Sequence, residues 1–268
     1  MGGVAVGLCG RIARMTRPVF ATPSLNWTVS LEYLRSWTET HWALANRGIQ
    51  SGVLTRGGDC FVAKVRNKMV TEFLRNFPSA TDLFFLDDDI GWPAAKVVEF
   101  LDRPEAVLAG VYPKKSEMTD FPVELAANDR TGELIERDGL VRANAAPTGF
   151  MRIKRHVLET LADTAQRFVD LELDGSTPDH YGIFESGIGT NGWWWGEDYT
   201  FCQKWTGAGG EIWIDPSIAF THRGQRKWEA TLSDHLDAFR ERGRQAVAKL
   251  NATPPLEIDI NEGKLEAA

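Results

Sequence analysis

Three consecutive aspartates, Asp87, Asp88 and Asp89, directly follow the apolar run Asp82–Leu86. Such a run is typical of a strand that is buried on both faces, and ligands of open α/β sheets bind beyond the carboxyl ends of the strands. Adjacent carboxylates repel one another unless a positive group joins them. A hard dication with oxygen ligands does so and can also hold a diphosphate, so this turn is a predicted metal and phosphate site. The alternative is a solvated acidic turn, or an N-cap of the helix expected after it.

A second candidate site contains three tryptophans, Trp193, Trp194 and Trp195, followed by a glycine and then by Glu197 and Asp198. Neighbouring side chains diverge in any regular element, so the three indoles cannot all face one core. Aromatic faces beside carboxylates commonly line sugar sites, and a carboxylate is the usual general base for a hydroxyl group. The simpler explanation is that the two acids only complement the dipole at the start of a helix.

Three further candidates are weaker when each is taken alone. His222 ends an expected strand, where a single histidine is more often structural than a ligand, although an acidic metal site elsewhere in the chain favours the ligand role. Arg66 and Asn67 lie on an expected helix, where the alternative is a solvated face. Thr22 and Pro23 follow the first expected strand, where a turn constrained by proline could hold a flat base.

Hydrophobic periodicity predicts the elements that must position these side chains. The first 90 residues alternate between strands and helices, expected at 18–22, 29–46, 49–55, 60–76 and 82–86. The first helix is expected to bury a face that bears Leu31, Leu34, Trp37, His41, Leu44 and Ala45. The second is expected to bury Val62, Val65, Met69, Val70 and Phe73. This alternation is half of a doubly wound sheet.

The pattern is less regular after residue 90. Helices are expected at 93–101, 155–164, 197–205 and 232–250, and strands at 106–111, 149–153, 211–214 and 217–222. Turn residues predict a short antiparallel hairpin within 113–146, and a composition rich in Gly, Ser, Thr and Pro predicts a long loop at 174–191.

Composition excludes several classes of protein. The 268 residues carry a net charge of -7, and no apolar run reaches the roughly 18 residues that a membrane helix needs. The three cysteines are too few and too widely spaced for a disulfide scaffold or a zinc knuckle, which favours a reducing compartment. Residues 78–222 carry a net charge of -13, while residues 1–77 and 223–250 are both basic. This distribution suits a cation that bridges to a phosphate-bearing ligand, although acids and bases that pair across the surface would explain it as well.

The ordered combination of these motifs resembles a known group. A β-α-β-α-β start, an Asp-x-Asp sequence after a buried strand, a later Glu-Asp pair before a helix and a histidine near the end look like glycosyltransferases of the GT-A fold. Family 2-like nucleotide-sugar transferases are the most similar. Segments 83–93, 109–114, 147–155, 196–205 and 210–224 also resemble glycosyltransferase-like proteins of tailed bacteriophages. The resemblance spans residues 15–224 and implies an α/β, Rossmann-like GT-A fold with a mostly parallel central sheet flanked by helices.

The resemblance also implies how the donor is held. Asp87 and Asp89 match the Asp-x-Asp motif, which binds Mn²⁺ or Mg²⁺ and the ribose and diphosphate of the donor. His222 matches a C-terminal metal-binding histidine. The implied donor-binding residues come from three segments and are Thr22, Pro23, Arg66, Asn67, Asp87, Asp88 and Asp89.

The implied acceptor side of the site lies in the second half of the chain. Asp198 matches the general base of inverting members, with Glu197 beside it as a second catalytic candidate. The acceptor-binding candidates are Trp193, Trp194, Trp195 and Gly149. The Q-x-x-R-W motif of the family is not evident, which argues against a processive polysaccharide synthase. Trp-Gly-Glu before a helix also resembles retaining peptide GalNAc-transferases, so both stereochemical outcomes stay open.

We therefore expect a metal-dependent glycosyltransferase that moves a sugar from a nucleoside diphosphate sugar to a hydroxyl acceptor. The acceptor classes that the resemblance raises are a modified DNA base, a glycan or a protein, and the expected location is the cytoplasm, that of the host if a phage encodes the chain. The alternatives are a nucleotidyltransferase of related fold and a non-catalytic carbohydrate-binding protein. Expected segments are an extension at 1–14 (or an edge strand over 4–8), the GT-A domain at 15–230, a helix at 231–250 and a flexible tail at 251–268.

Overall fold

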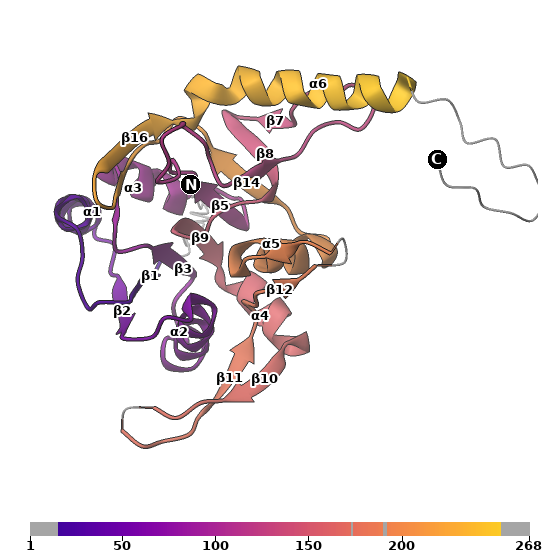
Figure 1. Cartoon of the computed structure of the whole chain (residues 1–268). Helices are drawn as coiled ribbons and strands as arrows, with labels where there is room; N and C mark the ends of the chain where they lie inside the picture. Colours follow the sequence, from indigo (N-terminus) through magenta and orange to yellow (C-terminus); the bar gives the residue numbers. More distant parts are fainter. Residues whose placement is uncertain (1–15, 173, 190–191, 253–268) are drawn as a thin grey trace, which may run out of the picture.

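The computed structural model describes residues 16–172, 174–189 and 192–252. Their architecture is α/β, with a central sheet between two layers of helices (Figure 1). The predictions for residues 1–14 and for the tail beyond Ala252 lie outside the described residues. The predicted α/β fold, with a central sheet flanked by helices, is confirmed, and the sheet is mixed.

Within the described residues the sheet has nine strands, of which eight follow the order β2-β1-β3-β9-β5-β14-β8-β6, with β7 paired to β8. Strands β9 and β8 run antiparallel to the other seven strands. Three of the neighbouring pairs described here are therefore parallel and five are antiparallel, so the sheet is mixed. The strands are β1 (Pro18–Ser24), β2 (Gly52–Gly57), β3 (Asp82–Leu86), β5 (Val107–Gly110), β6 (Glu124–Leu125), β7 (Glu136–Arg137), β8 (Leu140–Ala145), β9 (Phe150–Lys154) and β14 (Ile212–Asp215).

The helices pack on opposite faces of this sheet. Helices α1 (Leu31–Asn46) and α3 (Ala94–Asp102) cover one face, and α2 (Val62–Asn76), α4 (Arg155–Thr164) and α5 (Glu197–Gly207) lie on the other (Figure 1). Strand β3 shows how both faces are filled: Leu83 and Phe85 join the core beneath α2, whereas Phe84 and Leu86 join the core beneath α1 and α3. Burial on both faces explains why this strand reads as an unbroken apolar run.

Helix α1 buries only part of the expected face: Leu44 is buried and Trp37 packs against the core. Leu31 is 78% exposed and Leu34 also faces solvent, whereas Tyr33, Ser36 and Thr40 are buried. The buried hydroxyl groups are satisfied by one tryptophan: Ser36 Oγ accepts from the backbone N–H of Trp92 at 2.8 Å, and Thr40 Oγ1 accepts from its indole N–H at 3.0 Å. Apolar periodicity was misleading here because two buried positions are occupied by polar side chains with specific partners.

The predicted elements of the first half are otherwise present with shifts of a few residues at their ends, and β3 and α4 match their expected ranges. The hairpin expected within 113–146 is β7 and β8, which join through Asp138 and Gly139 in left-handed conformations. One strand of the central sheet, β6, was not predicted. The other strands that were not predicted belong to small sheets: β4 (Ile90–Gly91), β10 (Gln166–Val169), β11 (Asp179–Gly182), β12 (Gly187–Ile188), β13 (Trp194–Trp195) and β16 (Lys227–Thr231), whereas β15 (Ala219–Arg223) was predicted. Strands β11 and β12 lie in the segment that was expected to be a long loop.

The C-terminal helix α6 (Leu236–Ala252) follows a short 3₁₀ turn, η1 (Leu232–His235), and runs along one end of the molecule (Figure 1). It therefore starts later than expected and includes residues 251 and 252 of the predicted tail. Leu232 and Leu236 anchor its start in the core, and Arg240 Nη2 contacts Glu136 of β7 at 2.6 Å.

Candidate active site

The acidic turn lies at the carboxyl edge of the sheet, where β1 and β3 end side by side. A cavity of about 390 Å³ opens there between the turn, the loop after β1 and the start of α2. Its walls are formed by Pro23, Ser24, Leu25, Asn26, Asp59, Cys60, Val62, Val65, Arg66, Asp87, Asp88 and Asp89. The edge of the sheet at which a ligand was predicted to bind thus contains a cavity, and all three aspartates line it.

Arg66 joins the two acidic motifs of the sequence. Its Nη2 donates to Asp87 Oδ1 at 2.9 Å, and its Nε donates to Glu197 Oε1 at 3.3 Å, although Arg66 and Glu197 are 131 residues apart. The guanidinium is buried, which opposes its charge, but the two carboxylates outweigh burial and raise the pKa of Arg66. Its Nη1 is buried and has no hydrogen-bond partner among the described residues, so the N–H groups of this nitrogen remain for a ligand.

Tyr112 and Gly149 position the carboxylate of Asp87 from below. The Tyr112 hydroxyl group donates to Asp87 Oδ2 at 3.1 Å, and the backbone N–H of Asp87 donates to the Gly149 carbonyl at 2.8 Å. Burial, together with Asp87, holds the pKa of Tyr112 well above its usual value, so its phenol keeps the proton that it donates. Gly149 is buried beneath the turn, which gives it a packing role in place of the predicted acceptor contact.

Asp89 lies on the other side of the turn, between Lys115 and His222. Strand β4 follows Asp89 directly and pairs with β15, which places His222 opposite Ile90. The His222 Nε2 atom lies 3.5 Å from Asp89 Oδ1, and the ammonium group of Lys115 contacts Asp89 Oδ2. Burial alone would raise the pKa of Asp89, but His222 and Lys115 outweigh it and hold the pKa below its usual value.

The donor atoms of Asp89 and His222 fit a divalent cation. His222 Nδ1 lies 2.7 Å from the Pro113 carbonyl oxygen, which can only accept, so Nδ1 carries a hydrogen. Nε2 then faces Asp89 Oδ1, and a metal ion could bind between these two atoms. Histidine ligands are commonly oriented by a hydrogen bond from the other ring nitrogen to a carbonyl group. Within the described residues, no group of three or more His, Cys, Asp or Glu side chains is arranged around a common point. A cation here would complete its shell with water or ligand phosphates, as Mg²⁺ commonly does.

Asp198 is the acid with the most perturbed proton affinity in this region. It lies in the first turn of α5, where its Oδ1 accepts from the backbone N–H of Tyr199 at 2.9 Å. Burial raises the pKa of Asp198 to about 6, and the neighbouring Glu197 carboxylate adds to the shift. A carboxylate with such a pKa can take a proton near neutral pH, as a general base must.

The three tryptophans diverge as expected. Trp193 and Trp194 are 74% and 71% exposed, whereas Trp195 packs over Gly189, where no side chain could fit. Trp194 lines a second cavity, of about 560 Å³, beside the first one. The indoles of Trp193 and Trp194 are therefore exposed at the surface, whereas the indole of Trp195 packs within the short β12–β13 hairpin.

Two predicted donor-binding residues have contacts inside the fold. Asn67 Oδ1 accepts from the backbone N–H groups of Ile183 and Phe184 at 2.9 and 2.8 Å, and its Nδ2 donates to the Phe184 carbonyl at 2.7 Å. Thr22 is buried and shares a hydrogen bond of 2.6 Å with the Tyr33 hydroxyl group. The side chains of Asn67 and Thr22 therefore form hydrogen bonds within the fold, and neither residue lines the cavity that Arg66 and Pro23 line.

The loop after β1 also shapes the turn. The backbone N–H of Ser30, the N-cap of α1, donates to the Asp88 carbonyl at 2.8 Å. Burial raises the pKa of Asp88, and its hydrogen bond with Ser24 acts in the opposite direction. The turn is therefore held in place by its backbone as well as by its carboxylates.

Comparison with known proteins gives distant similarities. The sequence matches no protein-family model and no curated protein. Among solved structures, the chain is similar to A197 from STIV, with a TM-score of 0.49 and 20% identity over 81% of this chain and 91% of that one. It is also similar to a glycosyltransferase involved in the glycosylation of the major capsid of PBCV-1, with a TM-score of 0.32 and 11% identity over 53% of this chain and 62% of that one.

Tyr112 and Lys115 are site residues that the sequence analysis did not identify. Both follow β5, whose carboxyl end lies at the same edge of the sheet as that of β3. A tyrosine and a lysine placed after a buried strand were the available signal. In the described part of the chain, no helix is both long and apolar enough to cross a lipid bilayer.

Proposed function

We propose that this chain is a metal-dependent glycosyltransferase that moves a sugar from a nucleoside diphosphate sugar to a hydroxyl acceptor. The observation that carries the proposal is the position of Arg66 between Asp87 and Glu197. It fastens the acidic turn, which is suited to a diphosphate, to the start of α5, where Asp198 follows Glu197 and has the raised pKa that suits proton transfer. Neither motif alone supports group transfer, and their proximity supplies both halves of such a site.

The cavity at the acidic turn would hold the donor. Pro23 and Asn26 line the part next to β1, where a nucleoside would lie, and the unpaired Arg66 Nη1 would donate to a phosphate. Asp89 and His222 would hold Mn²⁺ or Mg²⁺, whose contribution when bound is to neutralise charge on the departing diphosphate. Lys115, in contact with Asp89, adds a second positive charge at this position.

Asp198 would act on the acceptor. As the acceptor oxygen forms its bond to the anomeric carbon, the bond from that carbon to the diphosphate breaks, and the hydroxyl proton passes to Asp198 Oδ2 or Oδ1. The nucleoside diphosphate leaves with the electron pair. A single displacement of this kind inverts the anomeric configuration, so we propose an inverting reaction. Glu197 is held by Arg66 and would orient the acceptor or Arg66 itself.

The test is a panel of UDP, GDP, CDP and TDP sugars, each with Mn²⁺ or Mg²⁺ and with EDTA. We expect the sugars of one nucleotide to raise the melting temperature of the protein, and we expect the protein to hydrolyse them slowly with release of nucleoside diphosphate. Both effects should require the metal ion. The Asp198→Asn variant should keep the thermal stabilisation and lose the release. A panel in which no nucleotide sugar stabilises the protein or is hydrolysed would overturn the proposal. The modified DNA base, glycan and protein acceptors are then distinguished by transfer of a radiolabelled sugar.

A further inference from the structure

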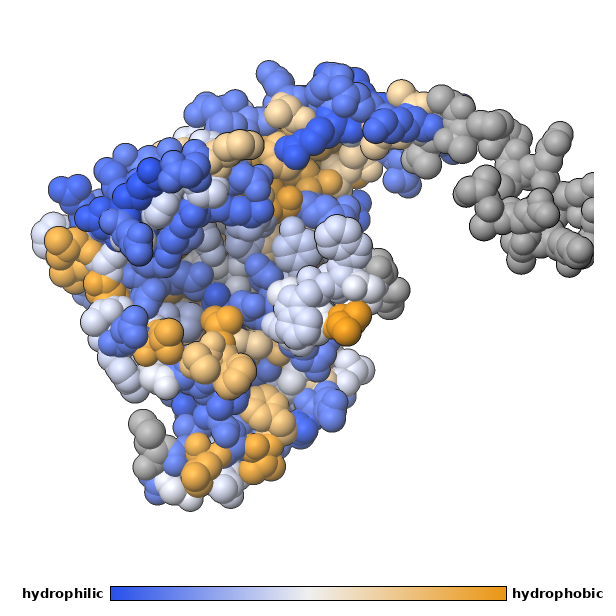
Figure 2. All heavy atoms as spheres, in the orientation of Figure 1, coloured by the Kyte–Doolittle hydropathy of each residue, from blue (hydrophilic) through white to orange (hydrophobic). Residues whose placement is uncertain are grey.

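A second cavity lies beside the donor cavity, and four of its ten lining residues are aromatic. It has a volume of about 560 Å³, and its wall shares Cys60 and Val62 with the acidic cavity. The remaining lining residues come from α2, β10, the segment after β11, and β13: Phe61, Ala63, Lys64, Asn67, Phe168, Phe184, Ser186 and Trp194. Hydrophobic residues gather over α2 on the face of the molecule shown in Figure 2.

Two of the four aromatic rings that line this cavity are largely exposed. Phe61 is 67% exposed and Trp194 is 71% exposed, and both border the same hollow. Phe184 forms the floor, stacked on Phe201 with ring centroids 4.9 Å apart and an interplanar angle of 12°. Large apolar side chains that meet around a hollow at the surface mark a binding site more often than chance exposure.

The amide of Asn67 and the ammonium group of Lys64, two polar groups that line the cavity, are already engaged. The Asn67 amide binds the backbone of Ile183 and Phe184, and Lys64 Nζ contacts Asp59 at 2.7 Å and Asp170 at 3.2 Å. A sugar ring would need free donors and acceptors for its hydroxyl groups, and a charged ligand would need an unpaired counter-charge. The cavity therefore favours an uncharged, flat and apolar ligand over either of these.

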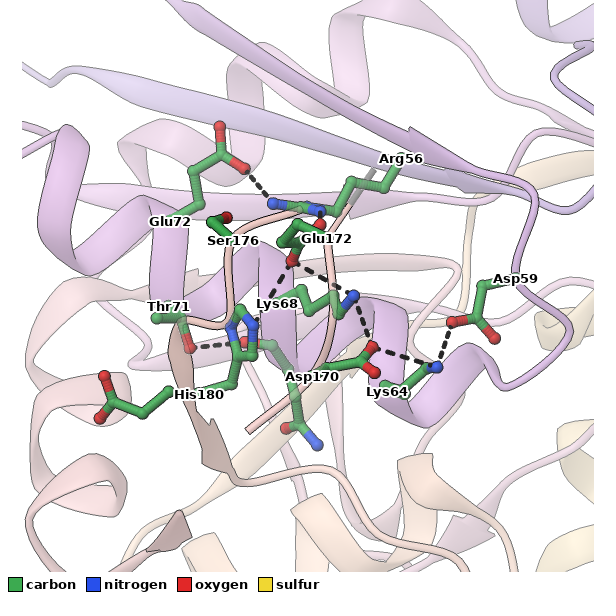
Figure 3. Close-up of polar contacts among 12 residues, drawn as sticks. Arg56, Asp59, Lys64, Lys68, Thr71, Glu72, Asp170, Glu172, Ser176 and His180 are labelled. Carbon is green, nitrogen blue, oxygen red and sulfur yellow. Dashed lines mark hydrogen bonds and ion pairs between the residues drawn. The ribbon is translucent and has the colours of Figure 1, made fainter. Parts of the chain in front are cut away.

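An ion-pair network, shown in Figure 3, fixes the segment next to one wall of the cavity. Lys64 and Lys68 of α2 both contact Asp170, and Lys68 and Arg56 both contact Glu172, at distances of 2.6 to 3.2 Å. These contacts fasten the segment that follows β10 to α2 and β2, and β10 carries Phe168 into the cavity wall. A wall fixed in this way does not need to be ordered when a ligand binds, which favours affinity.

We propose that this cavity binds an aromatic ring of the acceptor, next to the hydroxyl group that receives the sugar. The proposal rests on the proposed glycosyltransferase function and deepens it, because it names the class of acceptor. The shared wall at Cys60 and Val62 places a ring-bearing acceptor against the donor cavity. Offset stacking and edge contacts with Phe61, Phe168, Phe184 and Trp194 select an aromatic ring over a saturated one of similar size.

Cys60 provides a readout that does not depend on activity. Its thiol is exposed in the shared wall, whereas Cys202 is buried and burial raises its pKa to about 12, so Cys202 is unreactive. In a Cys9→Ser background, the rate of Cys60 modification by Ellman's reagent is measured with phenyl, cyclohexyl and methyl β-D-glucopyranosides as probes. Phenyl glucoside at ten times its Kd should slow the modification roughly tenfold.

Matched variants connect the protection to the rings. Phe61→Ala and Trp194→Ala should abolish protection by phenyl glucoside with little change in melting temperature, because both side chains are largely exposed. Trp42→Ala is the control, since Trp42 is 64% exposed on α1 and does not line the cavity. Each variant is compared with itself in the presence and absence of the probe, so altered intrinsic reactivity of Cys60 cancels.

The outcomes separate this proposal from the proposed function. Equal protection by all three glucosides, or by the phenyl and cyclohexyl compounds alone, overturns the assignment of an aromatic ring. Metal-dependent hydrolysis of a nucleotide sugar without any protection by phenyl glucoside retains the glycosyltransferase and overturns the aromatic cavity. Ring-specific protection in a chain that neither binds nor hydrolyses any nucleotide sugar supports the ring site and overturns the glycosyltransferase function.

Discussion

Gly149 lies directly beneath the carboxylate of Asp87, so closely that a Cβ atom on Gly149 would stand 2.7 Å from Asp87 Cγ and overlap the Tyr112 hydroxyl oxygen. We expect Gly149→Ala to displace Asp87 from Tyr112 and Arg66 while the core below remains packed. A displacement of about 1 Å at a reacting site can cost on the order of 100-fold in rate, and we expect a loss of turnover of that size. Steady-state release of nucleoside diphosphate measures it.

Gly207→Ala is the matched control for this substitution. Gly207 ends α5, and an added Cβ atom there would meet no other atom within 4 Å. The Gly207→Ala variant should keep wild-type activity, and its melting temperature should equal or slightly exceed that of the wild type, because alanine favours a helix more than glycine does. Full turnover in Gly149→Ala would show that the contact between Asp87 and Tyr112 does not matter for catalysis.

The pH dependence of activity should follow Asp198. A base works in its deprotonated form, and the pKa of Asp198 is about 6. We therefore expect kcat/KM to be constant above about pH 7 and to fall about tenfold for each pH unit below 6. In Asp198→Asn this acid limb should disappear, and turnover should be lower by about two to four orders of magnitude at all pH values. An unchanged acid limb in the variant would assign the titration to another group.

Asp198→Asn should also make the protein more stable at neutral pH. The pKa of Asp198 is raised from 3.8 in the unfolded chain to about 6 in the folded one, so the folded state binds the proton more tightly. Stability contributed by this group is present below about pH 4, falls as pH rises to 6 and is absent above that. We expect a gain of about 1 to 3 kcal/mol in unfolding free energy at pH 7.5 and a much smaller difference at pH 4, measured by urea denaturation. A less stable variant at pH 7.5 would mean that the carboxylate is stabilising.

Asn67 is expected to affect stability and not donor binding. Asn67→Ala removes the partner of two buried backbone N–H groups, at Ile183 and Phe184, and should cost about 2 to 4 kcal/mol of unfolding free energy. Asn144→Ala is the control, because Asn144 is exposed and its side chain donates to Glu124 at the surface. A raised KM for the donor in a variant of unchanged stability would restore the predicted nucleotide contact.

Asp89→Asn is expected to remove the coupling between metal and nucleotide. With the nucleoside diphosphate at a hundred times its Kd, Mn²⁺-dependent stabilisation of the wild type should be about 2.7 kcal/mol, and the variant should lose it. The variant should still fold, since Asp89 is partly exposed and its neighbours are polar. Asp129→Asn, in an exposed turn, controls for the change of net charge. Retained Mn²⁺-dependent stabilisation in Asp89→Asn would place the metal elsewhere.

Some of the site was predictable because local physical chemistry determines it. An apolar strand buried on both faces must end at the surface, so Asp87, Asp88 and Asp89 had to lie at an edge of the sheet. In the same way, Gly196 followed by Glu197 and Asp198 indicated the start of α5, where acids are favoured by the helix dipole. Neither conclusion needed a contact with a distant segment.

Other features depended on contacts that periodicity does not encode. The buried face of helix α1 was predicted only in part, because Ser36 and Thr40 are buried to bind Trp92, which lies outside that helix. Asn67 was assigned to the donor because its partners, Ile183 and Phe184, lie more than 100 residues away. A side chain's hydrogen-bond partner is a property of the folded chain, and the type of residue alone does not reveal it.

The sequence alone determined which groups could do chemistry here and that the acids of the turn would lie beyond a buried strand. Only the tertiary structure decided how those acids are divided: Arg66 takes Asp87 and Glu197, whereas Asp89 faces Lys115 and His222. The physical reason is that a charge interacts with whatever lies within a few ångströms of it. These neighbours come from α2, α5, β15 and the segment after β5, which only the packing of the sheet and its helices brings together.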